Sequence, residues 1–171
     1  MENITIYFDM DGVLSVFNDS VPMEKTFIEG YFYSVTPYEN MVELINRLSE
    51  DLNVKILSCV YRDNHTINDK NKWRTKVGIN EDIEAIYVPY GEDKKDYVSR
   101  EGIKILLDDF TPNLRDWHKI PNFIGIKVFT ETNTRKGYGS WHGLSIDVEN
   151  DVNMTEKMLR GLISSLSIEV A

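Results

Sequence analysis

Short apolar runs alternate with polar and amphipathic stretches along most of this chain. The runs have the length of buried strands and predict strands at 4–8, 54–57, 85–88, 103–107 and 123–129. The stretches between and after them predict helices at about 36–48, 69–76, 93–100, from 111, and a closing amphipathic helix at about 153–166. Strands that alternate with helices form βαβ units. We therefore expect an α/β, Rossmann-like three-layer fold with a central parallel sheet.

Capping motifs set the expected starts of three of these helices. In each motif a polar side chain can accept a hydrogen bond from the first helical turn, and Pro or Glu occupies a favoured early position. The motifs are Thr36-Pro37-Tyr38-Glu39, Thr111-Pro112 and Asn153 to Glu156.

No repeat, low-complexity tract or polar linker divides the chain, so we expect residues 1–171 to form one domain. An aromatic-rich stretch at about 15–36 separates the first strand from the first long helix, and it predicts a small cap or lid insert. Within this stretch Phe17, Tyr31 and Phe32 are candidate substrate contacts. Ordinary core packing is the alternative role for these rings.

Charge and cysteine content narrow the functional classes. The formal net charge of −9 argues against binding to a nucleic-acid polymer, which requires a basic surface. A small anionic substrate is compatible with it, because a metal and a few local cations can dominate the field inside a cleft. The single cysteine, Cys59, excludes an internal disulfide and a cysteine-based zinc cluster. We find no signal peptide and no membrane-spanning run, so we expect a cytoplasmic protein that binds no membrane.

The sequence Asp9-Met10-Asp11-Gly12-Val13-Leu14 directly follows the first predicted strand. Side chains at i and i+2 of an extended chain lie on one side, so Asp9 and Asp11 can converge on one point. Converging carboxylates repel each other unless a cation lies between them, and a divalent metal is the usual answer. A hard-metal site beside a nucleophilic carboxylate points to phosphoryl chemistry.

Further polar residues follow other predicted strands. Ser58 follows the second strand, and Asp108-Asp109 follow the fourth. In a parallel sheet these strand ends lie at one edge, where such folds bind ligands. Asp108, Asp109, Asp9 and the carbonyl oxygen of Asp11 together offer an octahedral oxygen shell for Mg²⁺.

Phosphoryl transfer through a covalent intermediate requires a nucleophile, a proton donor, a cation and groups that bind the phosphate oxygens. Asp9 can act as the nucleophile, and Asp11 can protonate the leaving oxygen and later activate water. Ser58 offers a hydroxyl to the phosphate. Either Lys94 or Lys95 can neutralise the acidic cluster, and the sequence leaves the choice between them open.

The order of these motifs resembles that of the haloacid dehalogenase superfamily of phosphotransferases. The resemblance implies an aspartyl-phosphate mechanism with Mg²⁺. It further implies these roles, residue by residue: Asp9 as nucleophile, Asp11 as acid and base, Ser58 with Cys59 as the phosphate-binding pair, Lys94 as the stabilising lysine, and Asp9, Asp11, Asp108 and Asp109 as metal ligands. Which of the last two aspartates binds the metal directly is left open.

Within that superfamily the chain looks most like the small 5′(3′)-deoxyribonucleotidase branch. The similarity lies in the first motif, in Gly30-Tyr31-Phe32, in Lys94-Lys95-Asp96-Tyr97-Val98 and in Leu106-Leu107-Asp108-Asp109. It implies a nucleoside monophosphate as the substrate. Another small phosphorylated metabolite is the alternative, and the oligomeric state stays open.

Other functional classes fit the sequence less well. A calcium loop would place Gly at position six, whereas Gly12 is at position four counted from Asp9. A dehalogenase would need neither Asp11 nor the late acidic pair, as the resemblance implies. A phosphate-sensing receiver domain would place its acidic pair before the phosphorylated aspartate. Trp141-His142-Gly143 is a further polar and aromatic cluster, for which a structural role is favoured over a functional one.

Overall fold

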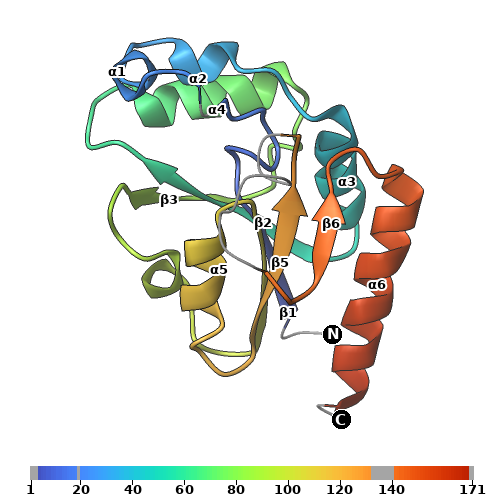
Figure 1. Cartoon of the computed structure of the whole chain (residues 1–171). Coiled ribbons are helices and arrows are strands. Elements are labelled where there is room, and N and C mark those ends of the chain that lie inside the picture. Colours follow the sequence, from blue (N-terminus) through green and yellow to red (C-terminus); the bar gives the residue numbers. More distant parts are fainter. Residues whose placement is uncertain (1–3, 19, 132–140, 170–171) are drawn as a thin grey trace.

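Six parallel strands form one sheet in the order β3-β2-β1-β4-β5-β6 (Figure 1). The structure is a computed structural model and describes residues 4–18, 20–131 and 141–169. The strands are β1 (Ile4–Phe8), β2 (Asn53–Val60), β3 (Ala85–Pro89), β4 (Ile103–Asp108), β5 (Phe123–Phe129) and β6 (Ser145–Asp147). Each neighbouring pair is parallel. The predicted α/β fold with a central parallel sheet is confirmed, and β6 is a strand that the hydrophobic pattern missed.

Helices cover both faces of the sheet, because successive residues of a buried strand point to opposite sides. Ile6 and Phe8 of β1 belong to the core cluster under α3 and α6, whereas Tyr7 packs edge-on against Trp117 of α5 on the other face. This alternation produces three layers. The helices are α1 (Met23–Thr26), α2 (Tyr31–Ser34), α3 (Glu39–Ser49), α4 (Thr66–Lys76), the 3₁₀ helix η1 (Lys94–Tyr97), α5 (Thr111–Trp117) and α6 (Val152–Glu169).

The predicted capping box at residue 36 is wrong. Helix α3 begins at Glu39, after Tyr38 in an extended conformation, and no side chain caps it. The main chain before it is used elsewhere: the carbonyl of Thr36 accepts the N–H of Val16, and Pro37 forms an antiparallel bridge with Ser15. This pairing holds residues 36 and 37 in an extended conformation, so the helix starts later.

Two other predicted caps also shift. At the start of α6 the side chain of Asp151 accepts the N–H groups of Asn153 and Met154, so Asp151 takes the capping role expected of Asn153. In α5 Phe110 occupies the N-cap position, and Thr111 is the first helical residue. The helix predicted at 93–100 is only the short 3₁₀ turn η1.

The segment between β1 and α3 lies beyond the carboxyl ends of the strands, with α2 packed along α4 and α1 packed against α2 (Figure 1). Three side chains that lie in α4 or just before it bind the main chain of the segment between β1 and α3. Asp69 accepts the N–H of Gly30 at 2.6 Å, Trp73 donates to the carbonyl of Val35 at 2.8 Å, and a ring nitrogen of His65 lies 3.0 Å from the Phe27 carbonyl. None of the helices in the described part of the chain has the length and apolar character to cross a membrane.

Candidate active site

The first acidic motif and the late acidic pair meet where β1 and β4 lie side by side. In the strand order found here, the chain leaves β1 toward β2 on one side and later returns to β4 on the other. Parallel sheets bind ligands in the crevice at this switch point. Asp9 follows β1, and Asp108 ends β4. Carboxylate oxygens of Asp9, Asp108 and Asp109 all lie within 4.8 Å of one another.

Gly12 makes room for the third carboxylate. Its φ is +80°, a conformation that L side chains rarely adopt. A Cβ added to Gly12 would lie 2.3 Å from both Cγ and Oδ2 of Asp109. The glycine that follows the Asp-x-Asp motif is therefore required twice, once for the turn and once for the close approach of Asp109.

We expect Gly12→Ala to displace the Asp109 carboxylate and to strain the turn. Positive-φ strain and the contact together should cost about 1–3 kcal/mol of folding free energy. Loss of a properly placed carboxylate should also weaken Mg²⁺ binding. Urea unfolding and calorimetric titration with Mg²⁺ measure the two effects. Gly78→Ala is the matched control, since Gly78 also has positive φ but would have open space around an added Cβ; equal loss of Mg²⁺ binding in both variants would contradict the steric explanation.

The structure places Lys94, and not Lys95, in the acidic cluster. The Nζ of Lys94 lies 2.9 Å from Asp9 and 2.7 Å from Asp108, and its side chain is buried. Burial by itself lowers the pKa of Lys94, but the carboxylates of Asp108 and Asp9 outweigh it and raise that pKa well above its ordinary value. Lys95 points elsewhere and pairs with Asp93 near the surface. Lys94 is thus a fixed positive charge between two strand ends.

A second buried lysine, which the sequence reasoning missed, joins the other predicted residues. Lys70 of α4 donates to the Asp11 carboxylate at 2.6 Å, to the Ser58 hydroxyl at 2.9 Å and to the Cys59 carbonyl at 2.9 Å. Ser58 and Cys59 lie inside β2 and not after it, because β2 continues to Val60. Sequence periodicity gave no sign of Lys70, since the buried face of α4 is largely polar.

The carboxylates carry the electrostatic signature of a cation site. Burial and then the charges of Asp108 and Asp9 raise the pKa of Asp109 well above its usual range. Burial also raises the pKa of Asp108 and of Asp11, which Lys94 and Lys70 respectively offset only in part. Within the described residues the Asp109 carboxylate accepts no hydrogen bond, whereas Asp108 binds Lys94, Asn113 and the Phe110 N–H.

These observations fit a hard divalent metal. Three carboxylate oxygens converge, and one carboxylate has unused lone pairs and a strongly disfavoured charge. Asp9, Asp108 and Asp109 are the residues that would hold Mg²⁺. The Asp11 carboxylate is bound to Lys70 instead, so the predicted ligand role of Asp11 rests on its carbonyl oxygen and stays a prediction.

Burial raises the pKa of the Cys59 thiol to about 11, so the thiol is neutral near pH 8. Since the thiolate is the reactive form, we expect iodoacetamide to modify the native protein at least about a hundredfold more slowly than free cysteine at pH 8. The rate should rise steeply above pH 10. Mass spectrometry of the time course measures it, and the urea-unfolded protein is the control. Rapid alkylation at pH 8 would mean that Cys59 is an activated thiol.

The predicted lid residues occupy different environments. Phe32 is buried and its ring centroid lies 4.8 Å from Nζ of Lys70, so the ring covers Lys70. Tyr31 packs edge-on against Phe32. Phe17 is half-buried and makes no ring contact within the described residues.

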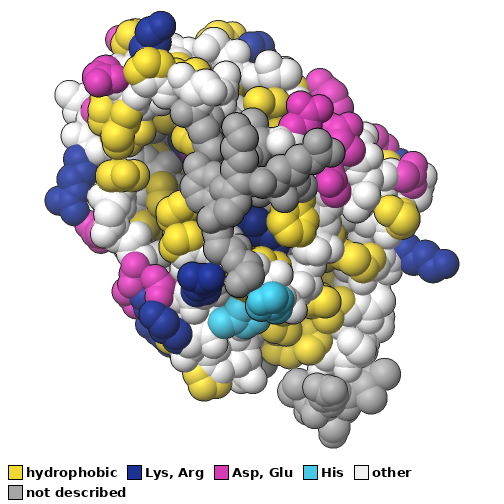
Figure 2. All heavy atoms as spheres, viewed as in Figure 1, with side chains coloured by type: hydrophobic (Ala, Val, Ile, Leu, Met, Phe, Trp, Pro, Cys, Tyr) yellow, Lys and Arg dark blue, Asp and Glu magenta, His cyan; other side chains and the backbone are white. Residues whose placement is uncertain are grey.

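Two tyrosines that the sequence reasoning did not assign to the site extend this aromatic cluster. Tyr61 follows β2, and Tyr90 follows β3, so both stand at carboxyl ends of strands. The Tyr61 ring lies 4.3 Å from Phe27, 6.0 Å from Phe32 and 5.6 Å from Tyr90 between centroids. Phe27 is 44% exposed and Tyr90 is 60% exposed. Hydrophobic side chains gather over α1 and α2 on the face shown in Figure 2. The exposed hydrophobic residues in and between these two helices are Met23, Phe27, Ile28 and Tyr33.

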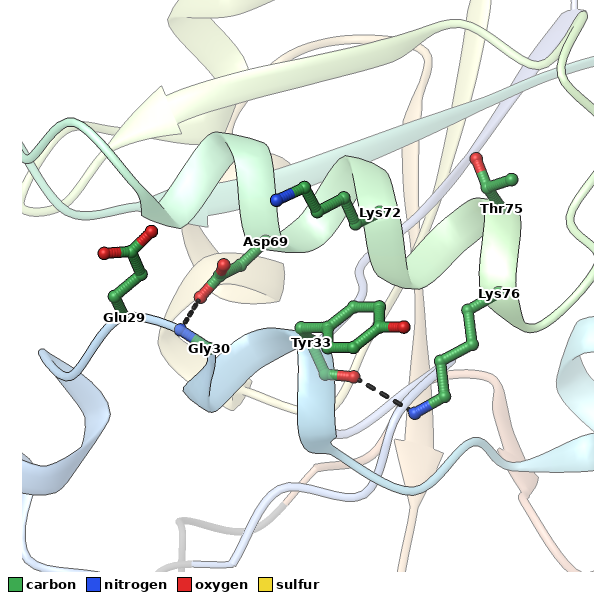
Figure 3. Close-up of a pocket in the computed structure, with 7 residues that line it drawn as sticks. All are labelled: Glu29, Gly30, Tyr33, Asp69, Lys72, Thr75 and Lys76. Carbon is green, nitrogen blue, oxygen red and sulfur yellow. Dashed lines mark hydrogen bonds between the residues drawn. The ribbon is translucent and has the colours of Figure 1, made fainter.

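A groove of about 670 Å³ runs between α2 and α4 (Figure 3). In it the carboxylate of Asp69 binds the Gly30 N–H, and Lys76 reaches the Tyr33 carbonyl. The lining residues are Glu29, Gly30, Tyr33, Asp69, Lys72, Thr75 and Lys76. None of the four aspartates of the acidic motifs is among them, so this groove is separate from the candidate active site.

The Trp141-His142 cluster lies outside the acidic site. Trp141 stacks on His118 with 5.5 Å between ring centroids and donates to the Leu144 carbonyl. His142 is exposed and makes no contact with the four aspartates within the described residues. The structural role that the sequence favours for this cluster stays a prediction.

Comparison with solved structures identifies the same fold in a known enzyme. The crystal structure of D,D-heptose 1,7-bisphosphate phosphatase from Burkholderia thailandensis superposes with a TM-score of 0.61. The two sequences are 14% identical, and the match covers 91% of this chain and 97% of that one. The shared feature is the fold: a Rossmann-like parallel sheet between helical layers. No family model and no curated protein sequence matches the chain.

Proposed function

We propose that this protein is a Mg²⁺-dependent phosphomonoester hydrolase of the haloacid dehalogenase type that works through an aspartyl-phosphate. The observation that carries the proposal is the convergence of Asp9, Asp108 and Asp109 around one point, with the buried Lys94 bound to two of them. The structural neighbour is named as a phosphatase, and it shares the fold that creates this convergence.

Each predicted residue has a chemical task in this proposal. A carboxylate oxygen of Asp9 attacks phosphorus while the ester P–O bond breaks, and Asp11 gives its proton to the departing oxygen. Burial favours the protonated form of Asp11 that this step requires. Water then attacks the phosphorus of the aspartyl-phosphate and gives a proton to Asp11, which frees inorganic phosphate and Asp9. Mg²⁺, when bound, supplies charge neutralisation to the phosphoryl oxygens.

Lys70 and Ser58 are suited to bind and orient during these steps. The Lys70 ammonium holds the Asp11 carboxylate at 2.6 Å, which fixes the direction of its second oxygen. The Ser58 hydroxyl accepts from Lys70, and its own O–H is left to donate to a phosphate oxygen. Cys59 contributes its main-chain carbonyl to Lys70, and we assign no chemical role to its thiol.

We further propose that the substrate is a nucleoside monophosphate. The support is the aromatic cluster of Phe27, Phe32, Tyr61 and Tyr90, which stands at the ends of β2 and β3 next to Ser58 and Lys70. Exposed aromatic faces stack on nucleobases, with about 1–3 kcal/mol for each base in single-stranded nucleic-acid complexes. Segment 15–36, which carries Phe27 and Phe32, acts as the lid in this proposal.

Release of inorganic phosphate from a substrate panel tests the proposal. The panel comprises nucleoside 5′- and 3′-monophosphates, sugar phosphates and p-nitrophenyl phosphate, each with Mg²⁺ and with EDTA. We expect Mg²⁺-dependent release, with kcat/KM highest for nucleoside monophosphates. Preference for a sugar phosphate would replace the substrate assignment and keep the mechanism. Phosphorylation of Asp9 without release would identify a sensing domain, and no reaction in any arm would refute the enzyme.

Replacement of Tyr90 separates the substrate assignment from the chemistry. Tyr90 is the most exposed ring of the cluster, and Tyr90→Ala should raise KM for nucleoside monophosphates while kcat/KM for p-nitrophenyl phosphate stays the same. Tyr97→Ala is the control, because Tyr97 is also an exposed tyrosine but lies in η1 and bonds Glu92. Equal KM values in all three proteins would remove the aromatic cluster from the substrate site.

A further inference from the structure

Lys127 of β5 is a buried lysine without a carboxylate partner. Its side chain is almost wholly buried, and within the described residues no carboxylate oxygen lies within 4 Å of its Nζ. The Nζ donates instead to the main-chain carbonyl of Asp109 and to the Thr111 hydroxyl, the latter at 3.2 Å. A buried ammonium without an ion pair is costly, so its presence calls for a reason.

The position of Lys127 in the sheet suggests a reason for burying this charge. It pairs in register with Asp108 across β4 and β5, at the carboxyl edge of the sheet. Lys127 therefore stands directly behind the acidic pair, on the strand next to it. Burial lowers the pKa of Lys127, and the nearby carboxylates of Asp109 and Asp108 offset this only in part.

We propose that Lys127 sets the charge balance of the active site so that the metal-loaded site accepts a dianionic phosphate. Lys70 and Lys94 each bind a carboxylate of the site, whereas Lys127 donates to a carbonyl and a hydroxyl oxygen and, within the described residues, to no carboxylate. Its positive charge therefore lies beside the acidic pair without a carboxylate partner that cancels it, and there it adds to the charge of Mg²⁺ in attracting a phosphate. This inference rests on the proposed function.

Lys127 should change the affinities for Mg²⁺ and for phosphate in opposite directions. A nearby positive charge repels Mg²⁺ and attracts phosphate, so Lys127 weakens binding of the first ligand and tightens binding of the second. Damage to the geometry of the site would weaken both. The two affinities measured in one variant therefore distinguish a charge-balancing residue from a merely structural one.

Calorimetric titration of Lys127→Met tests this. We expect the Kd of Mg²⁺ alone to fall about threefold or more, and the Kd of inorganic phosphate for the Mg²⁺-saturated protein to rise about tenfold, as a unit charge at several ångströms in a partly buried site allows. Lys127→Gln is the second variant, with the same expected signs and a polar head in place of the methyl end, should Lys127→Met fold poorly.

Lys104→Met is the matched control. Lys104 is buried on the adjacent strand β4, and its Nζ also bonds a threonine hydroxyl, that of Thr5, but it lies near the opposite end of the strand. Lys104→Met should leave both Kd values within about twofold of those of the unaltered protein. Weakening of both ligands in the Lys127 variants, or no change in either, would overturn the inference alone. Failure of the unaltered protein to bind Mg²⁺ would overturn the proposed function with it.

Discussion

Asp9→Asn is expected to abolish phosphate release while the protein stays folded. The amide cannot form the acyl-phosphate, so kcat should fall by at least about 10³-fold. The fold should survive because Asn is nearly isosteric, its Oδ1 can still accept the Met10 N–H, and Lys94 keeps Asp108 as a partner. Steady-state release of phosphate and urea unfolding measure the two quantities.

Two further variants sharpen this prediction. Asp9→Ala excludes slow reversion of Asn to Asp as a source of residual activity, and it should be equally inactive. Asp63→Asn is the control, since Asp63 is an acid near the lid that caps α4 and takes no part in the chemistry. Full activity of Asp9→Asn would show that Asp9 is not the nucleophile. If the variant lost activity because it unfolded, the urea unfolding curve would reveal the loss of stability.

Lys94→Met is expected to impair both stability and activity. Removal of this ammonium leaves Asp9 and Asp108 as buried carboxylates without their counter-ion, and breaking a buried pair in this way costs about 3–5 kcal/mol. The loss should be largest in EDTA and smaller with Mg²⁺, because a metal that binds only the folded state stabilises it. Activity should fall at least about a hundredfold.

Lys95→Met is the natural control for that experiment. The two lysines are neighbours in the same 3₁₀ turn, and Lys95 pairs with Asp93 outside the acidic cluster. Exposed pairs of this kind contribute about 0–1 kcal/mol, so Lys95→Met should unfold and turn over nearly as the unaltered protein does. A large effect of Lys95→Met with none from Lys94→Met would reverse the assignment of the site lysine.

The hydrophobic pattern predicted the sheet well for a physical reason. Strands buried on both faces are mostly apolar, and the four interior runs of this chain are short, rich in apolar residues and separated by helices. The edge strand β6, with three residues and only Ile146 buried, has no such run and was missed. The predicted cap at Thr36 failed because main-chain pairing with Val16 and Ser15 decided that segment, and such pairing has no local sequence signal.

Amino-acid sequence by itself determined the α/β fold class and the acidic motifs, because a parallel sheet brings residues that follow its strands to one edge. Asp9, Asp108 and Asp109 were found in this way. Only the tertiary structure decided which lysine side chains lie close to these carboxylates. Lys70 lies on a polar helix face and Lys127 lies inside a strand, so no periodicity in the sequence marks either residue. Each becomes part of the site because folding places a carboxylate or a carbonyl oxygen within hydrogen-bonding distance of its ammonium group.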